Sequence, residues 1–153
     1  MLTIIIPAYN EEKVIEQTTK EYLNFFKEQV SEVEILIIPN GCTDKTVGIV
    51  NTLTKKYPHV KSVTSSVASK GNAIIEGFKH ATGDIICYVD ADNSTKPEML
   101  LTLIKELDDV DCVMGSRWLK EAKILKKQPL LRRIASRGYN VLVRLMLNLQ
   151  FTD

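Results

Sequence analysis

The sequence predicts one α/β domain, a three-layer α/β/α arrangement built around a mainly parallel sheet. Short, almost wholly apolar runs alternate along the chain with longer segments whose apolar residues recur at helical spacing. Strands that are apolar along their whole length are typical of parallel sheets covered by helices on both faces. Composition agrees, because 153 residues that are 44% hydrophobic and 25% charged suit one globular domain and exclude a disordered or disulfide-stapled chain.

The strands are expected at five short apolar runs. These are residues 2–6, 34–38, 60–64, 84–89 and 112–114. The run at 84–89 is strongly apolar, whereas the run at 60–64 is weaker and the last is only three residues long. Strands that alternate with helices pair in parallel, and ligands of such sheets bind beyond the carboxyl ends of the strands.

Four helices are expected between the strands, and a long basic amphipathic helix follows the last one. They span residues 11–29, 43–56, 70–81, 97–107 and 130–149. The fourth begins with a proline, which is favourable in the first turn of a helix. In the first helix the apolar face has helical spacing and consists of Val14, Ile15, Thr18, Tyr22, Phe25 and Phe26.

The formal net charge of +1 conceals an uneven distribution. Residues 1–116 hold 11 Lys and Arg against 17 Asp and Glu, a net of −6, whereas residues 117–153 hold 9 against 2, a net of +7. A basic tail indicates contact with an anion, although a solvated basic helix would have the same composition. The nearly neutral total gives no argument for binding to nucleic acid.

The cysteines and the N-terminus indicate the cellular compartment of the protein. The three cysteines form no CxxC pair and no zinc spacing with the two histidines, which favours reduced thiols, with Cys87 and Cys112 in the core. The N-terminus lacks the basic region of a signal peptide, and no apolar run approaches the ~20 residues that span a bilayer. We therefore expect a cytoplasmic protein or one on the cytoplasmic face of a membrane.

Polar and acidic residues gather where three of the predicted strands end, in the turns 7–12, 39–44 and 90–95. None of these turns is a GxGxxG or GxxxxGK[ST] loop, so dinucleotide-binding and P-loop sites are excluded. Asp90 and Asp92 could converge on one hard cation such as Mg²⁺ or Mn²⁺, which takes oxygen ligands and is often shared with a substrate diphosphate. An acidic helix start is the alternative interpretation.

Four ordered motifs resemble glycosyltransferase family 2, whose fold is GT-A. They are IIIPAYNEE, EILIIPNGCTD, SKGNAIIEGFKHATGDIICYVDAD and GSRW, and together they extend over most of the chain. Within that family the chain is similar to the polyprenyl-phosphate group, such as dolichyl-phosphate mannose or glucose synthases. The resemblance implies an inverting, metal-dependent hexosyltransferase that uses a GDP- or UDP-hexose, Mg²⁺ or Mn²⁺, and a polyprenyl phosphate as acceptor.

The resemblance assigns nucleotide binding to the first turn, to the second turn and to the residues around the two carboxylates. The implied nucleotide-binding residues are Pro7, Ala8, Tyr9, Asn10, Glu11, Asn40, Lys70, Asp90 and Ala91, and the implied metal ligands are Asp90 and Asp92. Independently, Tyr9 could stack on a base, Glu11 could accept hydroxyl hydrogen bonds, and Lys70 at a helix start offers positive charge to a diphosphate.

The second turn and the loop after Asp92 depart from the family pattern. Asn40 stands where the family has a nucleotide-contacting aspartate, which leaves the identity of the base open because asparagine also donates hydrogen bonds. Ser94 replaces a glutamine of some polyprenyl-phosphate members. Gly41 is expected at a positive φ, and Thr43 or Asp44 is expected to cap the next helix. Gly77 and Gly83 are expected to serve close helix packing or turns.

The resemblance assigns the acceptor to the basic end of the chain. The implied acceptor-phosphate residues are Arg117, Arg132, Arg133 and Ser136, and Arg117 and Asp153 are the implied catalytic residues. Residues 1–116 would form the nucleotide-sugar core and residues 117–153 an acceptor- and membrane-facing segment of the same domain. Asp153 stands where a DxxxGF motif would begin, so we expect a C-terminally truncated GT-A fragment that is weak or inactive as an enzyme.

Three other functions compete with this interpretation. The acceptor could be a glycan or glycolipid hydroxyl, or the chain could bind a nucleotide sugar without turning it over. A sugar nucleotidyltransferase is disfavoured because the glycine-rich N-terminal loop of that class is absent from the sequence.

Overall fold

The computed structural model describes residues 1–65, 67–116, 138 and 139. The chain divides into two compact units, residues 1–102 and 103–153, which are described separately. The elements in chain order are β1 (Leu2–Ala8), α1 (Ile15–Gln29), β2 (Val33–Pro39), α2 (Thr46–Lys56), β3 (Val60–Ser62), α3 (Lys70–His80), β4 (Ile85–Tyr88) and α4 (Pro97–Lys105).

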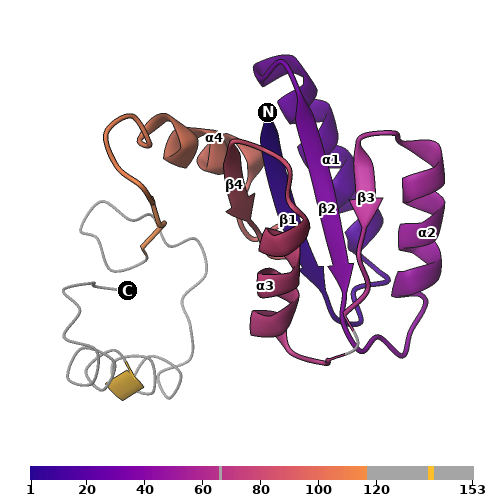
Figure 1. Ribbon diagram of the computed structural model, residues 1–153. Helices are drawn as coiled ribbons and strands as arrows, with labels where there is room; N and C mark the ends of the chain where they lie inside the picture. Colours follow the sequence, from indigo (N-terminus) through magenta and orange to yellow (C-terminus); the bar gives the residue numbers. More distant parts are fainter. Residues whose placement is uncertain (66, 117–137, 140–153) are drawn as a thin grey trace. The chain divides into compact units, whose positions relative to one another are not determined.

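The four described strands form one sheet in the order β3-β2-β1-β4, and every pair is parallel (Figure 1). Ile5 at the centre of β1 lies opposite Leu36 of β2 and Tyr88 of β4. The predicted parallel sheet is therefore confirmed, and the carboxyl ends of β1, β2 and β4 lie at one edge of it.

Helices cover both faces of the sheet, as predicted. Helix α3 lies on one face, while α1 and α2 contact each other and the sheet on the other (Figure 1). All seven residues of β1 and all seven of β2 are buried, which is why these strands are apolar except at Thr3 and Glu34. On the α3 face the core consists of Ile5, Leu36, Ile38 and Ala73.

A glycine sets how closely α3 approaches the sheet. A Cβ atom at Gly77 would lie 2.5 Å from Cγ2 of Ile5, so no larger residue fits there without movement of the helix or of β1. The sequence-based expectation that Gly77 serves close packing is confirmed.

Helix α1 begins at Ile15 and not at residue 11 as expected. The backbone N–H of Glu11 donates to Oγ1 of Thr46 at 2.8 Å, and that of Glu12 donates to Oδ2 of Asp44 at 3.1 Å. These residues therefore belong to a turn that is fastened to the start of α2. Periodicity alone does not detect such side-chain contacts, because they join residues far apart in sequence.

Two further expectations concern the C-terminal part of the chain. The predicted strand at residues 112–114 is wrong, because this segment is irregular, and Cys112 is exposed and not in the core. A run of three residues offers few ladder hydrogen bonds and little apolar surface to hold it in a sheet. The predicted basic helix over 130–149 lies outside the described residues, apart from residues 138 and 139.

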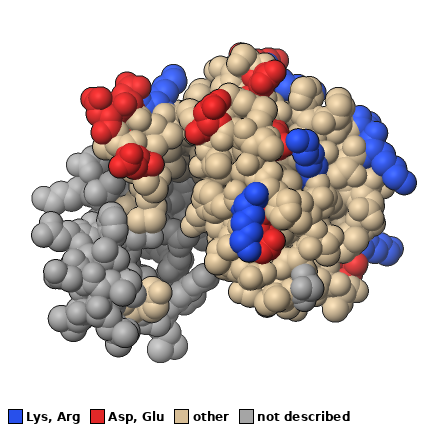
Figure 2. Space-filling model, viewed as in Figure 1, with Lys and Arg blue, Asp and Glu red and all other residues tan. Residues whose placement is uncertain are grey.

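The surface of the described residues carries both signs of charge. On the face shown in Figure 2, basic and acidic side chains of the described part are interspersed, with broad uncharged areas between them. Among the described residues, no helix is both long and apolar enough to cross a lipid bilayer.

Candidate functional site

The turns after β1 and β2 are joined through the side chain of Asn10. Its Oδ1 atom accepts hydrogen bonds from the backbone N–H of Thr43 at 2.7 Å and of Asp44 at 3.3 Å. Asn10 adopts a φ of 55°, a left-handed conformation that asparagine tolerates better than most residues. The predicted nucleotide-binding residue Asn10 therefore also holds the two turns together.

Asn40 joins the ends of the two strands below these turns. It is 3% exposed, and its Nδ2 donates to the carbonyl oxygen of Ala8 at 3.1 Å and, more weakly, to that of Ile38 at 3.4 Å. Pro7 and Ala8 are also buried. The structure thus places three of the predicted nucleotide-binding residues inside the protein, where Asn40 acts as a donor that an aspartate could not replace.

Acidic side chains of three turns share one region of the strand-end edge. Burial raises the pKa of Glu11 above its ordinary value, and the carboxylates of Asp92, Asp44 and Asp90 raise it further. Next to Glu11 in sequence, Tyr9 is 55% exposed and its ring is accessible to a ligand. The negative charges of these carboxylates repel one another and disfavour the ionised form of Glu11. A cation bound at this edge would reduce that repulsion and so stabilise the folded protein.

Asp44 already has hydrogen-bond donors on both of its oxygens. Oδ1 accepts from the N–H of Thr46 at 2.9 Å, and Oδ2 accepts from the N–H of Glu12. Lys45 occupies the cap position of α2 without a side-chain cap, and Asp44 supplies the acceptor instead. Burial would raise the pKa of Asp44, but the hydrogen bonds from Thr46 and Glu12 hold it below its ordinary value. The cap residue is thus Lys45 and not Thr43 or Asp44 as expected, although Asp44 accepts the N–H of the first helical residue from one position before the cap.

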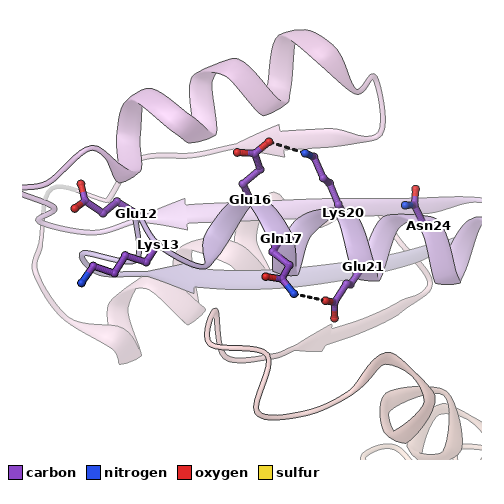
Figure 3. Close-up of a pocket in the computed structure, with 7 residues that line it drawn as sticks. All are labelled: Glu12, Lys13, Glu16, Gln17, Lys20, Glu21 and Asn24. Atoms are coloured by element: carbon purple, nitrogen blue, oxygen red, sulfur yellow. Dashed lines mark hydrogen bonds and ion pairs between the residues drawn. The ribbon is translucent and has the colours of Figure 1, made fainter.

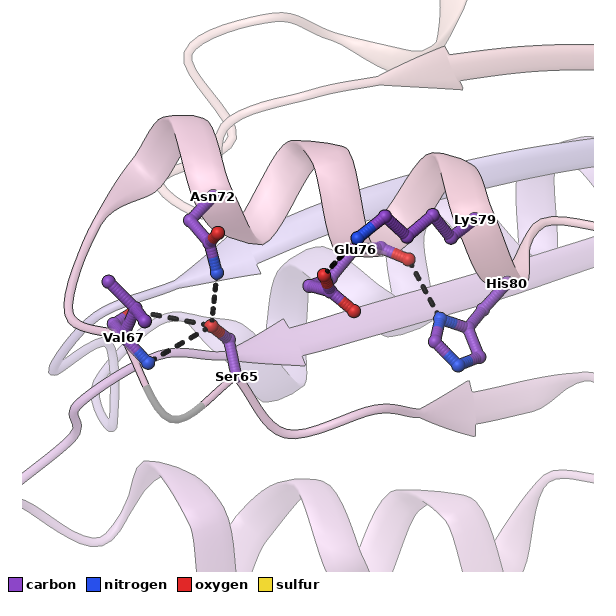
Figure 4. A network of polar contacts seen from close by, with 6 residues as sticks. All are labelled: Ser65, Val67, Asn72, Glu76, Lys79 and His80. Carbon is purple, nitrogen blue, oxygen red and sulfur yellow. Dashed lines mark hydrogen bonds and ion pairs between the residues drawn. The ribbon is translucent and has the colours of Figure 1, made fainter.

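The loop before α3 packs against the second turn. Gly41 has a φ of +62°, as predicted, and a Cβ atom there would lie 2.5 Å from Cβ of Ala68. Within the loop, the buried Ser65 accepts hydrogen bonds on Oγ from Nδ2 of Asn72 at 2.9 Å and from the N–H of Val67 at 3.3 Å (Figure 4). These contacts fix the start of α3 beside the strand-end edge.

Lys70 is the first residue of α3 and reaches the turn after β4. Its ammonium group forms an ion pair with Oδ1 of Asp90, and both side chains are partly exposed. The N-terminus of a helix carries partial positive charge and unpaired N–H groups, so it favours phosphate groups. The structure therefore brings together a lysine, a helix N-terminus and the first of the two predicted metal ligands.

The loop after β4 rests on α1 through hydrogen bonds that sequence reasoning missed. The hydroxyl of Thr18 donates to the carbonyl oxygen of Ala91 at 2.7 Å, and that of Tyr22 donates to the carbonyl oxygen of Thr95 at 2.6 Å. In the sequence both residues were assigned to the apolar face of the helix. The hydroxyl groups on this buried face were the one feature of the sequence that could have indicated these contacts, because a buried hydroxyl needs a hydrogen-bond partner.

The two carboxylates fit a divalent cation that is shared with a substrate. In the part of the chain that the structure describes, no three His, Cys, Asp or Glu side chains could together hold a metal ion. Mg²⁺ and Mn²⁺ are commonly held by one or two carboxylates together with substrate phosphates. The predicted metal ligands Asp90 and Asp92 are donors of that kind, and Asp90 contacts Lys70 at the start of α3.

The predicted acceptor and catalytic residues lie outside the described part of the chain. These residues are Arg117, Arg132, Arg133, Ser136 and Asp153. They therefore remain predictions, as do the nucleotide contacts.

The fold defines a class of protein, and solved structures share it. The mannosyltransferase PcManGT from Pyrobaculum calidifontis, solved with GDP-Man and Mn²⁺, is 25% identical with a TM-score of 0.60; the match covers 71% of this chain and 32% of that chain. The fold is that of the GT-A glycosyltransferases.

A sequence profile identifies the family within that class. The profile described as Glycosyl transferase family 2 matches residues 3–153, and the chain belongs to this family. The resemblance that the four motifs carry is confirmed.

Curated relatives include enzymes named for lipid phosphates. Dolichyl-phosphate beta-glucosyltransferase ALG5A of Trichomonas vaginalis is 33% identical over 93% of this chain and 47% of the relative. Dolichol-phosphate mannosyltransferase of Pyrococcus furiosus is 33% identical over 95% of this chain and 41% of the relative. The chain thus spans less than half the length of either protein.

Proposed function

We propose that this chain forms the nucleotide-sugar-binding part of an inverting glycosyltransferase that transfers a hexose from a GDP- or UDP-sugar to a polyprenyl phosphate. The observation that carries the proposal is the meeting of Lys70, the start of α3 and the Asp90–Asp92 turn at the carboxyl edge of the sheet. Cationic and anionic groups placed together in this way suit a diphosphate that is bound with a divalent cation.

Each turn has a part in binding the donor. Tyr9 stacks on the base and Glu11 accepts hydrogen bonds from the ribose hydroxyls, while Asn10 and Asn40 keep their turns in place. Lys70 and the N–H groups of α3 face the diphosphate. Asp90 and Asp92 would hold Mg²⁺ or Mn²⁺, which would supply charge neutralisation to the leaving diphosphate.

The reaction is a single displacement at the anomeric carbon. An oxygen of the acceptor phosphate forms a bond to C1 of the hexose as the bond from C1 to the diphosphate oxygen breaks, and the configuration inverts. The electron pair of the broken bond leaves with the nucleoside diphosphate. A phosphate acceptor is already ionised near pH 7, so this reaction needs less help from a general base than transfer to a hydroxyl does.

The basic segment 117–153 would receive the acceptor, and peripherally contact the membrane that contains it. Its net charge of +7 favours an anionic partner, and arginine matches phosphate oxygens with paired donors. Arg117, Arg132, Arg133 and Ser136 would bind the acceptor phosphate, with Arg117 and Asp153 acting in catalysis. Two relatives named for dolichyl or dolichol phosphate support this assignment.

An acceptor screen on the longest available form of the protein tests the proposal. The protein is incubated with Mn²⁺ and either GDP-mannose or UDP-glucose, and with either a polyprenyl phosphate or a panel of sugar hydroxyls. We expect labelled hexose to enter the organic phase only with the polyprenyl phosphate. Transfer to sugar hydroxyls alone would refute the proposed acceptor, and nucleotide binding without turnover would indicate a binding module.

A further inference from the structure

We propose that α1 is the element that positions the metal-binding loop, with Thr18, Glu21 and Tyr22 as its positioning residues. This inference rests on the proposed function, in which Asp90 and Asp92 hold a divalent cation. It assigns a role to three α1 side chains that do not themselves touch a ligand. The argument starts from how differently the two carboxylates are attached to the fold.

Asp90 directly follows a residue that is bonded to the sheet, whereas Asp92 lies further along the loop. The backbone N–H of Val89 donates to the carbonyl oxygen of Ile5 at 3.0 Å, so Asp90 directly follows a residue bonded to β1. Asp92 lies two residues beyond, and its Oδ1 accepts a hydrogen bond from the N–H of Ser94, inside the same loop. The position of Asp92 relative to Asp90 therefore depends on what holds the loop.

Thr18 holds the peptide group that precedes Asp92. Its hydroxyl is buried and donates to the carbonyl oxygen of Ala91, the residue between the two carboxylates. A peptide group is planar, so fixing that carbonyl also fixes the direction in which the N–H of Asp92 points. Thr18 thereby restricts the backbone at the point where the chain leaves the sheet.

Glu21 holds the residue that follows Asp92. Asn93 has a φ of 55°, and its Nδ2 donates to Oε2 of Glu21, while Lys96 places its ammonium 3.6 Å from the same oxygen. A carboxylate can only accept, so the amide nitrogen of Asn93 must face it. Among the described residues, the buried Oδ1 of Asn93 has no hydrogen-bond partner, whereas its Nδ2 is bonded to Glu21.

Tyr22 completes the attachment at the far end of the loop. Its hydroxyl donates to the carbonyl oxygen of Thr95, just before α4 begins at Pro97. Residues 18, 21 and 22 lie on one side of a helix, where side chains three or four apart are neighbours. One face of α1 thus holds the loop at residues 91, 93 and 95.

The chain offers a matched pair of substitutions for testing Thr18. Thr18 and Thr19 are both buried on α1, and each donates its hydroxyl to a backbone carbonyl at 2.7 Å. The bond from Thr18 crosses to Ala91 in the loop, whereas the bond from Thr19 stays within the helix, at Ile15. Thr18→Val and Thr19→Val remove the same kind of hydrogen bond and keep the branched shape.

Manganese affinity is the measurement that separates positioning from stability. Free Mn²⁺ is followed by electron paramagnetic resonance in the presence of UDP or GDP, and the melting temperature of each variant is recorded in parallel. We expect both variants to melt at similarly lowered temperatures. Only Thr18→Val should bind manganese more weakly, by about threefold to tenfold, the value of one hydrogen bond.

Glu21 provides a second test at the surface of the same helix. In Figure 3 Gln17 with Glu21 and Glu16 with Lys20 form two separate pairs on α1. We expect Glu21→Ala to weaken manganese binding. Glu21→Gln should retain most of the manganese affinity, because its side-chain oxygen is still an acceptor for Asn93. Glu16→Ala should leave manganese binding unchanged. This test holds even if Thr18→Val does not fold.

The outcomes distinguish the inference from the proposed function. Wild-type protein that shows no manganese-dependent nucleotide binding would overturn the proposed function and the inference with it. Wild-type protein that binds manganese, together with Thr18→Val and Glu21→Ala variants that bind it equally well, would overturn the inference alone.

Discussion

Asn40 shows at the scale of one residue why a side chain at a binding edge need not face the ligand. Its amide donates to carbonyl oxygens of both β1 and β2, and the backbone N–H of Asn40 also donates to Ala8, at 3.0 Å. The oxygen of Ala8 thus receives two donors from one residue. This arrangement requires a donor at position 40, and a carboxylate would place negative charge against carbonyl oxygens.

Asn40→Asp is therefore expected to destabilise the protein by about 1–3 kcal/mol, the usual range for a buried polar group that loses its partner. Urea unfolding near pH 7 measures the change. Asn51→Asp is the control, because Asn51 is exposed on α2. Equal free energies of unfolding for the two variants would contradict the role given to Asn40.

Glu34 is a buried carboxylate at the opposite end of the sheet. Its side chain is 5% exposed, and it accepts hydrogen bonds from Thr3 at 3.0 Å and from Thr82 at 3.3 Å, with the ammonium of Lys61 at 2.5 Å. Burial would raise the pKa of Glu34, but the contacts with Lys61, Thr3 and Thr82 hold it below its ordinary value of 4.5. The folded state thus favours the ionised form.

This lowered pKa predicts a definite pH dependence. A carboxylate with a depressed pKa contributes stability above pH 4.5, its ordinary value, and loses it as the pH falls through the folded-state pKa. Glu34→Gln should therefore be less stable than wild type near pH 7, by about 1–3 kcal/mol, and this gap should narrow towards about pH 3. Urea unfolding across this range checks it, with the exposed Glu28→Gln as control.

If the difference in free energy of unfolding between wild type and Glu34→Gln were the same near pH 7 and at about pH 3, Glu34 would not be held in its ionised form. Glu28→Gln should follow the wild-type stability at every pH.

At the scale of elements, two glycines inside helices make opposite predictions. Gly77 of α3 touches the sheet, whereas a Cβ at Gly48 of α2 would meet nothing within 4 Å. Gly77→Ala should destabilise the protein by about 1–3 kcal/mol through overpacking against Ile5. Gly48→Ala should stabilise it by about 0.5–1 kcal/mol, because alanine favours the helix.

Thermal and urea unfolding of the two variants measure this difference in sign. If Gly77→Ala were as stable as Gly48→Ala, α3 would not approach the sheet as closely as the structure shows.

The elements themselves were largely predictable, and the contacts between their ends were not. Apolar runs located β1 to β4, and helical spacing located α1 to α4, because burial on one face or both imposes a period on the sequence. The start of α1 was misplaced because Glu11 and Glu12 bond to the start of α2. The strand at 112–114 was wrong because a short apolar run does not by itself specify a partner.

The site shows the same division between what sequence patterns indicate and what they miss. Strand ends located the turns that carry Tyr9 and Asp90, because parallel strands bring those ends to one edge. No pattern indicated that Asn40 is buried between carbonyl oxygens, or that Thr18 reaches the loop after β4. Such contacts depend on which elements become neighbours in space.

At the scale of the whole molecule, the proposed division of labour follows the distribution of charge. The acidic residues 1–116 contain the turns proposed to bind the nucleotide sugar and a divalent cation. The basic residues 117–153 are proposed to face an anionic lipid. Family 2 membership and the GT-A fold are consistent with this arrangement, and the binding of donor and metal at the strand-end edge is its central claim.

Calorimetric titration of UDP and GDP into the purified chain, with and without Mn²⁺, tests that claim most directly. Asp92→Asn removes a proposed metal ligand, and Asp84→Asn is the matched control, because Asp84 is exposed at the opposite end of β4 and pairs with the N-terminal amine. We predict manganese-dependent binding that Asp92→Asn weakens at least about tenfold and Asp84→Asn leaves intact. Binding that is absent, independent of manganese, or equal in the two variants would contradict the account.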